Sequence, residues 1–331
     1  MKKILLLVFI FSLPFFASAQ YKGLNKKTKR TTSSFLKKRG RPQPEFILGI
    51  GAANFLGEVG GANQTGTNFV KDFEFSASRP SAAVGVRYKF HPRVAVKGGF
   101  YYQLVSGNDN LTKEPYRNNR NLHFKSSIYE LSAQAEFYIT KEKIGPASRY
   151  KIKNAKGMKN SGVQAYGFIG IGGFYFNPKA KYDGKWQKLH DLHTEGQGLP
   201  GGPKQYKRVS VCIPYGIGAK MRLNSDFAIG LEAGIRKTFT DYIDDVSGVY
   251  YDNNAIIAAY GATAGKAADP ALNNYPAELG GTSPSYNYGK FPWQAAPGEQ
   301  RGDIKDKDSY MFIDITLSYK IPKKRKTRSK F

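Results

Sequence analysis

Apolar and polar residues alternate with a period of two along much of the chain, most clearly near its C-terminus. There Met311 and Ile313 fall on one side of an extended segment, whereas Asp314 and Thr316 fall on the other. Such alternation places one face of a strand in an apolar medium and the other in polar surroundings. The pattern predicts eight strands, over residues 45–56, 81–90, 94–104, 128–139, 163–176, 209–223, 227–239 and 310–321.

The connections between these strands alternate in length. Residues 91–93 join the second and third strands and residues 224–226 the sixth and seventh, both with residues typical of tight turns. Short turns on one rim and long loops on the other are typical of outer-membrane barrels, whose short turns are periplasmic. We therefore expect an all-β fold, an eight-stranded antiparallel up-and-down transmembrane β-barrel with long outer loops. The long connections are 57–79, 106–121, 177–208 and 241–307, and the lysine-rich residues 140–162 depart from the rule.

The alternation does not by itself separate this barrel from a water-soluble one, which would have its apolar side chains inside. The polar faces are rich in Gly, Ser and Ala beside a few charges, which suits a narrow interior filled by side chains. Aromatic residues recur near strand ends, as in the girdles of membrane barrels. We expect the apolar faces to point outward, toward lipid. The aromatic residues are Phe46, Phe90, Tyr102, Phe227, Phe239 and Tyr319.

The N-terminus predicts export. Lys2 and Lys3 precede an apolar run over residues 4–16, and Ala-Ser-Ala at 17–19 fits a signal-peptide cleavage site. No later apolar run approaches the roughly 20 residues of a membrane-spanning helix. Cys212 is alone, so no disulfide or cysteine metal cluster is expected. The organisation we expect is a signal peptide (1–19), a basic periplasmic arm (20–44), an outer-membrane barrel (45–322, with 241–307 as a long outer loop or cap) and a basic periplasmic tail (323–331), with both termini periplasmic.

Most of the formal net charge of +26 lies in three segments, 21–44, 140–162 and 320–331, which all face the periplasm in this topology. A patch of one sign attracts opposite charge, so acidic protein faces, anionic lipids and cell-wall polymer are candidate partners. The alternative is that these segments are solvated tails. Nucleic acid is not expected, because no recognition motif is present. The candidate partner-binding residues are Lys26, Lys27, Lys29, Arg30, Lys37, Lys38, Arg39, Lys323, Lys324, Arg325 and Lys326.

Charged residues on the polar strand faces are expected to pair inside the barrel. An eight-stranded interior is narrow, and charges buried there need partners. This favours a salt-bridged plug over a conducting pore. The interior candidates are Arg87, Lys97, Glu130, Glu136, Arg222, Glu232, Arg236 and Asp314, with Lys89, Lys220 and Lys320 on the same faces.

Several stretches resemble the PorG-like outer-membrane barrels associated with type IX secretion. They are residues 117–122 and 124–126, 170–180, 194–198 and 239–247; the sequence departs from the pattern in 255–307, the basic arm and the tail. The resemblance implies a non-enzymatic component of the secretion machinery that works with periplasmic ring subunits resembling PorK and PorN, in contact with outer-membrane lipids. The alternative is a small structural or adhesive outer-membrane barrel whose loops bind surface ligands.

No catalytic, cofactor or metal site is predicted. His190 and His193 lie near Asp191 and Glu195, but the zinc motif HExxH is missing. The four histidines, which include His91 and His123, come with no nucleophile motif such as GxSxG. We therefore expect a protein that is not an enzyme.

Two loop motifs resemble ligand-binding motifs only weakly. An acidic run begins the last long loop, and its carboxylates could hold Ca²⁺, but the spacing matches no EF-hand. A solvated acidic rim is the expected form. The tripeptide Arg-Gly-Asp at 301–303 matches an adhesive motif and is expected in an exposed loop. The acidic residues are Asp241, Asp244, Asp245 and Asp252.

Overall fold

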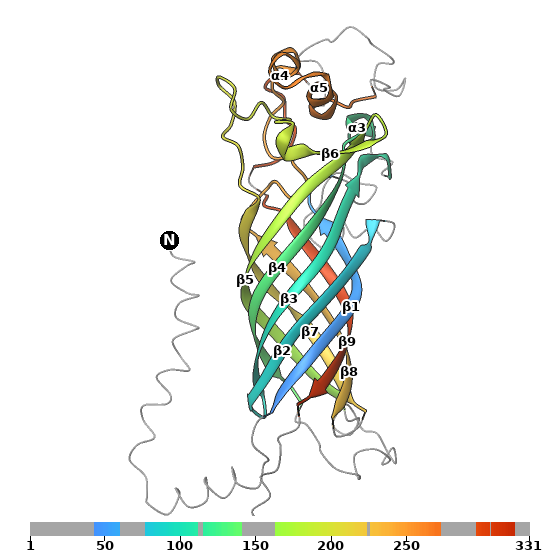
Figure 1. Cartoon of the computed structure of the whole chain (residues 1–331), viewed down its shortest axis with the longest axis vertical. Coiled ribbons are helices and arrows are strands. Elements are labelled where there is room, and N and C mark those ends of the chain that lie inside the picture. The colour runs from blue at the N-terminus through green and yellow to red at the C-terminus, as the bar shows by residue number, and fades with distance from the viewer. Residues whose placement is uncertain are drawn as a thin grey trace, which may run out of the picture. The chain divides into compact units, whose positions relative to one another are not determined.

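The computed structural model describes residues 43–59, 77–111, 115–140, 163–223, 226–272, 296–304 and 306–321 (Figure 1). Eight long strands form a cylinder, and a short ninth strand, β6 (Lys185–Lys188), extends it above one side. The eight are β1 (Pro44–Leu56), β2 (Arg79–His91), β3 (Val94–Asn108), β4 (His123–Tyr138), β5 (Val163–Tyr182), β7 (Val209–Arg222), β8 (Phe227–Thr238) and β9 (Ser309–Lys320).

The sheet closes on itself. Its strand order is β4-β3-β2-β1-β9-β8-β7-β5-β6, and the additional pairing of β4 with β5 completes the ring. All of these pairings are antiparallel, for example Leu48 with Leu317 between β1 and β9, and Tyr129 with Tyr175 between β4 and β5. The closed ring gives each of the eight long strands a neighbour on both sides, which removes the usual route to edge-to-edge association, and the short β6 pairs only with β5. The prediction of an eight-stranded antiparallel up-and-down barrel is confirmed.

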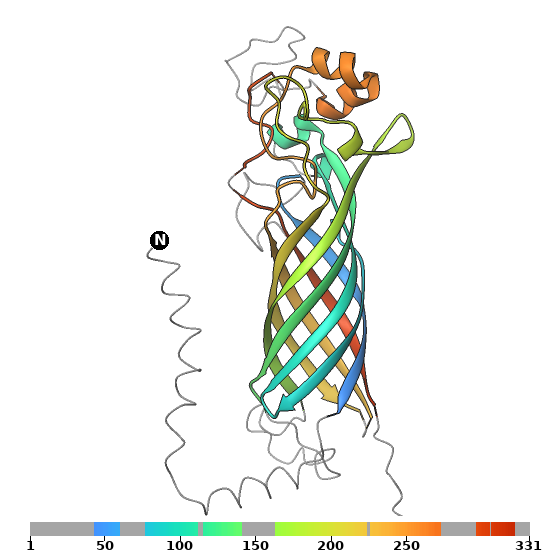
Figure 2. The ribbon, with the colours of Figure 1, turned by 60° about the vertical axis from the view of Figure 1, so that its left-hand side comes forward.

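The two ends of the cylinder differ, as Figures 1 and 2 show. The turn rim holds the β2–β3 turn, and the first and last barrel residues lie there too, because Pro44 pairs with Tyr88 and Glu45 with Lys320. At the opposite end, the loop rim, the connections are long. They contain the 3₁₀ helices η4 (Asp109–Leu111) and η7 (Leu189–Asp191) and the helices α3 (Pro115–Arg120), α4 (Asn253–Tyr260) and α5 (Ala262–Ala268). No helix in the described part of the chain is both long and apolar enough to span a membrane.

One side of the wall rises higher than the sequence pattern predicted. The strand expected over 163–176 continues to Tyr182, and the strand expected from 128 begins at His123. In these extensions the outward residues are polar, so the apolar alternation stops while the hydrogen-bonded ladder continues. The inward residues of the extensions, such as Phe124 and Ala180, are buried. The taller wall therefore supports the loops at the loop rim.

Most of the predicted basic segments lie outside the described part of the chain. The predicted signal peptide, nearly all of the basic arm, residues 141–162 and the basic tail lie outside the described residues. Every candidate partner-binding lysine and arginine belongs to these segments, so their role stays a prediction.

Candidate functional site

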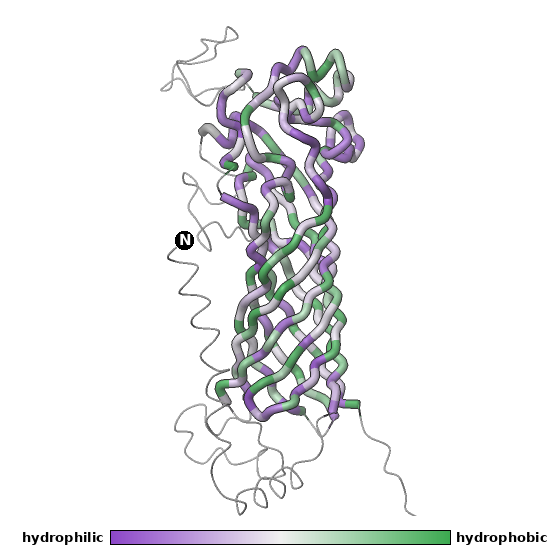
Figure 3. Tube along the Cα trace, turned by 90° about the vertical axis from the view of Figure 1, so that its left-hand side faces the viewer, coloured by the Kyte–Doolittle hydropathy of each residue, from purple (hydrophilic) through white to green (hydrophobic). Residues whose placement is uncertain are grey.

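The outward face of the barrel is apolar. On β4 and just after it, the residues that point outward from Tyr129 to Ile139 are all apolar, and Leu131 is 70% exposed. Elsewhere on the wall Ile171 and Ile217 are 67% and 71% exposed. Ten steps of about 3.3 Å, tilted by about 40°, rise about 25 Å, which is the height of the apolar band on membrane barrels. Figure 3 shows apolar residues recurring along the barrel wall, whereas polar residues prevail in the loops.

A row of tyrosines ends this apolar band toward the loop rim. Tyr102 of β3, Tyr129 of β4 and Tyr175 of β5 are register partners on successive strands. Their ring centroids are 5.3 Å apart for the first pair and 6.4 Å for the second. Beyond this row the next outward residues on β4 and β5 are Ser127 and Asn177. Tyr has an apolar body and a polar tip, so such a row suits an interface between hydrocarbon and water.

The lumen is crossed by a charged network centred on Arg87 of β2. Its Nε lies 2.6 Å from Glu136 Oε2, and its Nη1 lies 3.4 Å from Glu45 Oε2. Its Nη2 donates to Tyr166 Oη at 3.2 Å, and that hydroxyl donates to Glu232 Oε2 at 2.9 Å. One guanidinium thereby links five strands, because these partners come from β1, β4, β5 and β8.

Three further bases complete this network. Lys97 forms a buried ion pair with Glu232. Lys220 Nζ lies 2.7 Å from Glu45 Oε2, and Arg222 Nη2 lies 3.6 Å from Glu45 Oε1 nearer the turn rim. Glu45 was not among the interior candidates from the sequence. It starts a Gly-rich segment whose alternation is irregular, so its face could not be assigned from the pattern.

A second interior group lies on β4, β8 and β9. Arg236 Nε is 2.9 Å from Glu130 Oε2, and both side chains are fully buried. Tyr310 Oη donates to the same carboxylate oxygen at 3.2 Å. The guanidinium carbon of Arg236 lies 4.1 Å from the ring centroid of Phe312, a cation–π distance. The buried charges of this group are therefore neutralised and packed.

Three other interior candidates have different partners. Asp314 is buried and accepts a hydrogen bond from Ser81. Lys89 Nζ lies 3.8 Å above the ring of Tyr138. Lys320 is half-buried at the turn rim, where its backbone pairs with Glu45. Together with the two networks these contacts place paired charged and polar side chains along the described lumen.

A buried polar network closes the loop rim. Arg301 Nη1 lies 3.0 Å from Glu195 Oε1 and donates to the backbone oxygen of Asp245 at 2.6 Å. The Asp245 carboxylate accepts from Thr194 Oγ1 at 2.5 Å and from Tyr206 Oη at 2.6 Å. The expectation of an exposed Arg-Gly-Asp tripeptide is wrong for Arg301, which is buried in this network, whereas Asp303 is exposed. The sequence shows the tripeptide, but it does not show that Glu195 and Asp245 contact Arg301.

Arg120 ties a second loop to the same network. Its Nε lies 2.8 Å from Asp109 Oδ2, and its Nη1 donates to the backbone oxygen of Arg301 at 3.0 Å. Its Nη2 donates to the backbone oxygen of Glu58 at 2.8 Å. Loops that follow β1, β3, β5 and β8 therefore meet at one place.

The acidic run at 241–245 is not a solvated rim, and that expectation is corrected. Asp241, Asp244 and Asp245 are all buried. Burial raises the pKa of Asp241 and of Asp245 to about 6 each. Burial, reinforced by neighbouring carboxylates, raises the pKa of Asp244 and of Asp308 well above the usual range. The loops cover these carboxylates, which loop composition alone does not reveal.

Asp252 and Glu58 complete the acidic residues at this end. Asp252 caps the N-terminus of α4, where its side chain accepts from the backbone N–H of Asn254 at 3.0 Å. Burial raises the pKa of Glu58 to about 8, with the nearby charges of Asp241 and Asp303 adding to the rise. Among the described residues, no three His, Cys, Asp or Glu side chains are grouped so as to hold a metal ion.

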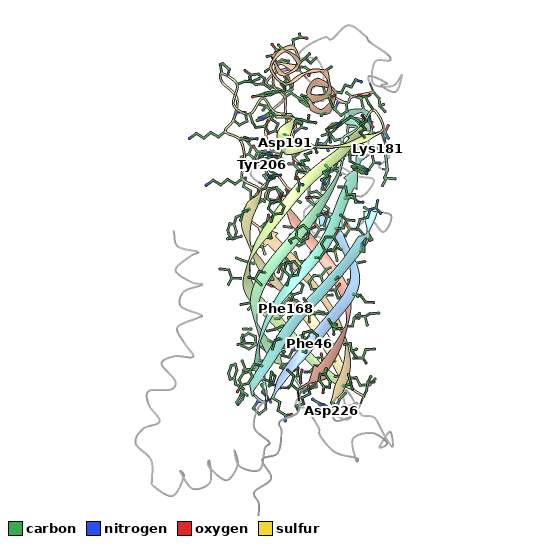
Figure 4. All side chains as sticks on the ribbon, viewed as in Figure 1. Phe46, Phe168, Lys181, Asp191, Tyr206 and Asp226 are labelled. Carbon is green, nitrogen blue, oxygen red and sulfur yellow. The ribbon has the colours of Figure 1, made fainter. Side chains whose placement is uncertain are left out.

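Aromatic rings pack under the loops. Phe176, Tyr206 and Tyr242 form a stack, with centroid separations of 6.1 Å and 4.4 Å and interplanar angles of 8°. Figure 4 labels Tyr206, Lys181 and Asp191 at the loop rim and Asp226 at the turn rim. The stack and the polar network together cover the loop end of the described lumen.

Three of the histidines, His123, His190 and His193, contact different parts of the structure. His123 Nε2 lies 3.1 Å from both the backbone O and the backbone N of Lys181. His190 Nε2 lies 3.2 Å from a backbone carbonyl oxygen, and His193 stacks on Tyr260 at a centroid distance of 4.2 Å. Each imidazole therefore has a local structural contact.

Comparisons with known proteins give a family match over part of the chain. A model described as a domain of unknown function, DUF6089, matches residues 43–149. No curated protein matches the chain. Among solved structures, Ail, the attachment invasion locus protein of Yersinia pestis, in complex with the heparin analogue sucrose octasulfate, is 10% identical with a TM-score of 0.36, over 85% of this chain and 100% of that chain. The outer membrane protein OprG from Pseudomonas aeruginosa is 12% identical with a TM-score of 0.30, over 86% of this chain and 99% of that chain. Neisserial surface protein A is 6% identical with a TM-score of 0.34, over 83% of this chain and 97% of that chain. The assignment of this chain to the eight-stranded barrels rests on the closed pairing of its own strands.

Proposed function

We propose that this protein is an integral outer-membrane barrel that acts as a non-enzymatic component of the type IX secretion machinery. The observation that carries the membrane part is the reversal of polarity across the wall. Apolar side chains such as Leu131 and Ile171 are exposed outside, whereas Arg87, Glu136 and Glu232 are buried inside. A water-soluble barrel has the opposite arrangement, and in lipid only helices and closed barrels satisfy every backbone polar group.

The interior supports a role as an anchor. Ion pairs such as Arg87 with Glu136 and Arg236 with Glu130 occupy the lumen, and the Arg301 network covers its loop end. Opening a solute pathway would break several buried ion pairs. Breaking a buried ion pair strongly destabilises the fold, because it leaves an uncompensated charge. We therefore assign partner binding to the two rims of the barrel.

The secretion role is supported by the stretches that resemble the PorG-like barrels. Three of them, residues 117–122, 194–198 and 239–247, contribute Arg120, Glu195 and Asp245 to the buried network at the loop rim. Segments distant in the sequence thus form one built unit. In this proposal the loop rim contacts another outer-membrane component, and the basic periplasmic arm and tail bind acidic faces of ring subunits resembling PorK and PorN.

Co-purification tests the secretion role. Deleting residues 21–42 and 323–331 from the otherwise intact chain spares every barrel strand. We expect the barrel still to reach the outer membrane and to show heat-modifiable gel mobility, while the ring subunits no longer co-purify at moderate salt. A control with each Lys of these segments changed to Arg keeps the charge and should keep the partners. Unchanged co-purification after both deletions rejects the basic segments as the binding site.

A second candidate function is binding of surface ligands by the outer loops. It is favoured by apolar side chains left exposed there, including Val249, Ile257 and Leu272. Changing these three residues to Ser would abolish adhesion to a surface ligand, but would leave the ring co-purification intact.

A further inference from the structure

The outward face just beyond the tyrosine row changes abruptly from apolar to basic. Lys125 of β4 pairs in register with Lys179 of β5, and Lys179 pairs with Lys188 of β6. Three lysines on adjacent strands thus form one transverse row. Two residues further along β5, on the same face, Lys181 pairs with Trp186 of β6.

These residues share the outer side of the wall. Along β5 the inward residues alternate with Tyr175, Asn177, Lys179 and Lys181, which face away from the buried interior. We call Lys125, Lys179, Lys181, Lys188, Trp186 and Arg208 the basic outer face. It exists only because β4 and β5 extend past the apolar band and β6 folds back beside them.

Local contacts hold this face in place. Arg208 lies with its guanidinium carbon 5.5 Å from the ring centroid of Tyr175, and its Nη1 lies 3.4 Å from Asn177 Oδ1. Lys125 Nζ lies 5.6 Å from the ring centroid of Trp186, which is 52% exposed. Cation–π contacts of this kind orient a charge and leave its remaining donors available.

Few acids neutralise these bases. Lys188 Nζ lies 4.0 Å from Asp191 Oδ2, but both side chains are more than half exposed. An exposed pair of that kind contributes little. Asp183, at the tip of the β5–β6 hairpin, pairs instead with Lys266 of α5 at 2.8 Å. The basic outer face therefore has a strong net positive charge.

Its height above the apolar band is informative. Successive outward residues on one strand are two positions apart, so each rises about 5 Å along the barrel axis. Lys125 and Lys179 therefore stand about 10 Å beyond the tyrosines of their own strands. The polar headgroup layer adds roughly 5–8 Å to each side of the hydrocarbon core, which puts the lysine row at and just above the headgroups.

We propose that the basic outer face binds the phosphate groups of an anionic lipid in the outer leaflet. This rests on the proposed membrane location. The row of ammonium groups offers phosphate several charge-assisted hydrogen bonds, and Trp186 places an amphipathic ring at the same depth. Juxtamembrane bases of this kind contribute about 1 kcal/mol each toward anionic lipid. The lipid occupies the exposed side of β4–β6, outside the barrel.

The test uses the full chain inserted in phosphatidylcholine nanodiscs, with Trp293→Phe leaving Trp186 as the single tryptophan. Diphosphorylated lipid A is titrated in and followed by Trp186 fluorescence. The test variant is Lys125→Gln/Lys179→Gln/Lys181→Gln. The matched control removes three lysines of the loop end that lie off this face, Lys185→Gln/Lys204→Gln/Lys237→Gln, and leaves the Lys266–Asp183 pair intact. Heat-modifiable mobility reports folding, and Lys179→Gln alone is a milder second variant.

We expect the test variant to bind lipid A at least about tenfold more weakly, with an intermediate loss for Lys179→Gln and no change for the control. Lipid A stripped of its phosphates should bind every variant weakly. Equal affinity of the test variant and the parent, or of the two forms of lipid A, overturns the proposal. So does competition by millimolar inorganic phosphate, which would identify a soluble anion as the ligand. A chain that fails to insert in the nanodiscs overturns the membrane location itself, whereas an inserted barrel with unchanged affinity overturns only the lipid site.

Discussion

Arg236 and Glu130 meet across the lumen, with Nε 2.9 Å from Oε2, although their strands β8 and β4 are not neighbours in the sheet. Both side chains are fully buried. This pair connects opposite parts of the wall, so it contributes to the stability of the whole cylinder.

Removing one partner of this pair should destabilise the barrel more than removing both. Glu130→Ala leaves the Arg236 charge buried without its carboxylate, which costs about 3–5 kcal/mol. Replacing both, with Glu130→Leu and Arg236→Met, keeps the volume and removes the uncompensated charge, so most of the stability should return. Urea unfolding in detergent, followed by heat-modifiable gel mobility, measures the difference. A double variant as unstable as Glu130→Ala would show that the pair is not acting through its charge.

A charge on the outward wall should be tolerated only outside the apolar band. Ile171 lies four residues from the girdle residue Tyr175, and Ile171→Arg should cost about 2–4 kcal/mol in a bilayer. Ser127→Arg, just beyond the tyrosine row, should cost about 1 kcal/mol or less. Folding into vesicles of defined thickness measures both. Equal costs at the two positions would contradict the position of the band.

The packed loops at the loop rim should become less stable as the pH rises. The pKa values of Asp241 and Asp245 are raised to about 6, and that of Glu58 to about 8. A carboxyl whose pKa is raised by folding binds its proton more tightly in the folded state, so its contribution is present at low pH and is lost as the pH rises through the folded pKa. The loss should fall between about pH 4, the ordinary carboxyl value, and about pH 8.

Hydrogen exchange of the loop-rim amides, corrected for intrinsic rates, should therefore be faster at pH 8.5 than at pH 5.5. Asp244→Asn keeps an acceptor for the N–H of Val246, which Asp244 now binds at 3.0 Å. Because it removes one carboxylate from the buried group, it should reduce the pH dependence. Strand amides near the turn rim serve as the internal reference. A pH response of equal size in both regions would place its origin elsewhere.

Arg301 should hold the loop rim closed against proteases. Arg301→Ala leaves Glu195 buried without its ion-pair partner, and local opening should increase cleavage of the loop-rim segments at least about tenfold. Lys237→Ala is the matched control, because its pair with Asp306, at 3.6 Å, is partly exposed and contributes little. Limited proteolysis of the folded barrel, with mass spectrometry of the products, compares the two.

The sequence by itself determined the strands and their faces. Alternation along segments such as 310–321 predicted the eight strands, because a strand with one apolar face and one polar face repeats with a period of two. It also indicated that Arg87, Glu136 and Glu232 share the interior. The alternation could not assign the face of Glu45, whose segment is Gly-rich. It also missed the loop-end parts of β4 and β5, because their outward residues are polar and the apolar alternation stops there.

Only the tertiary structure decided which residues meet. The pairing of Arg236 with Glu130, the burial of Asp244 and the alignment of Lys125 with Lys179 all depend on barrel closure and on how the loops fold over the rim. These contacts join residues far apart in the chain, and local periodicity carries no information about such partners. The physical reason is that register between strands is fixed by closure of the ring as a whole, whereas the face of each strand is fixed locally.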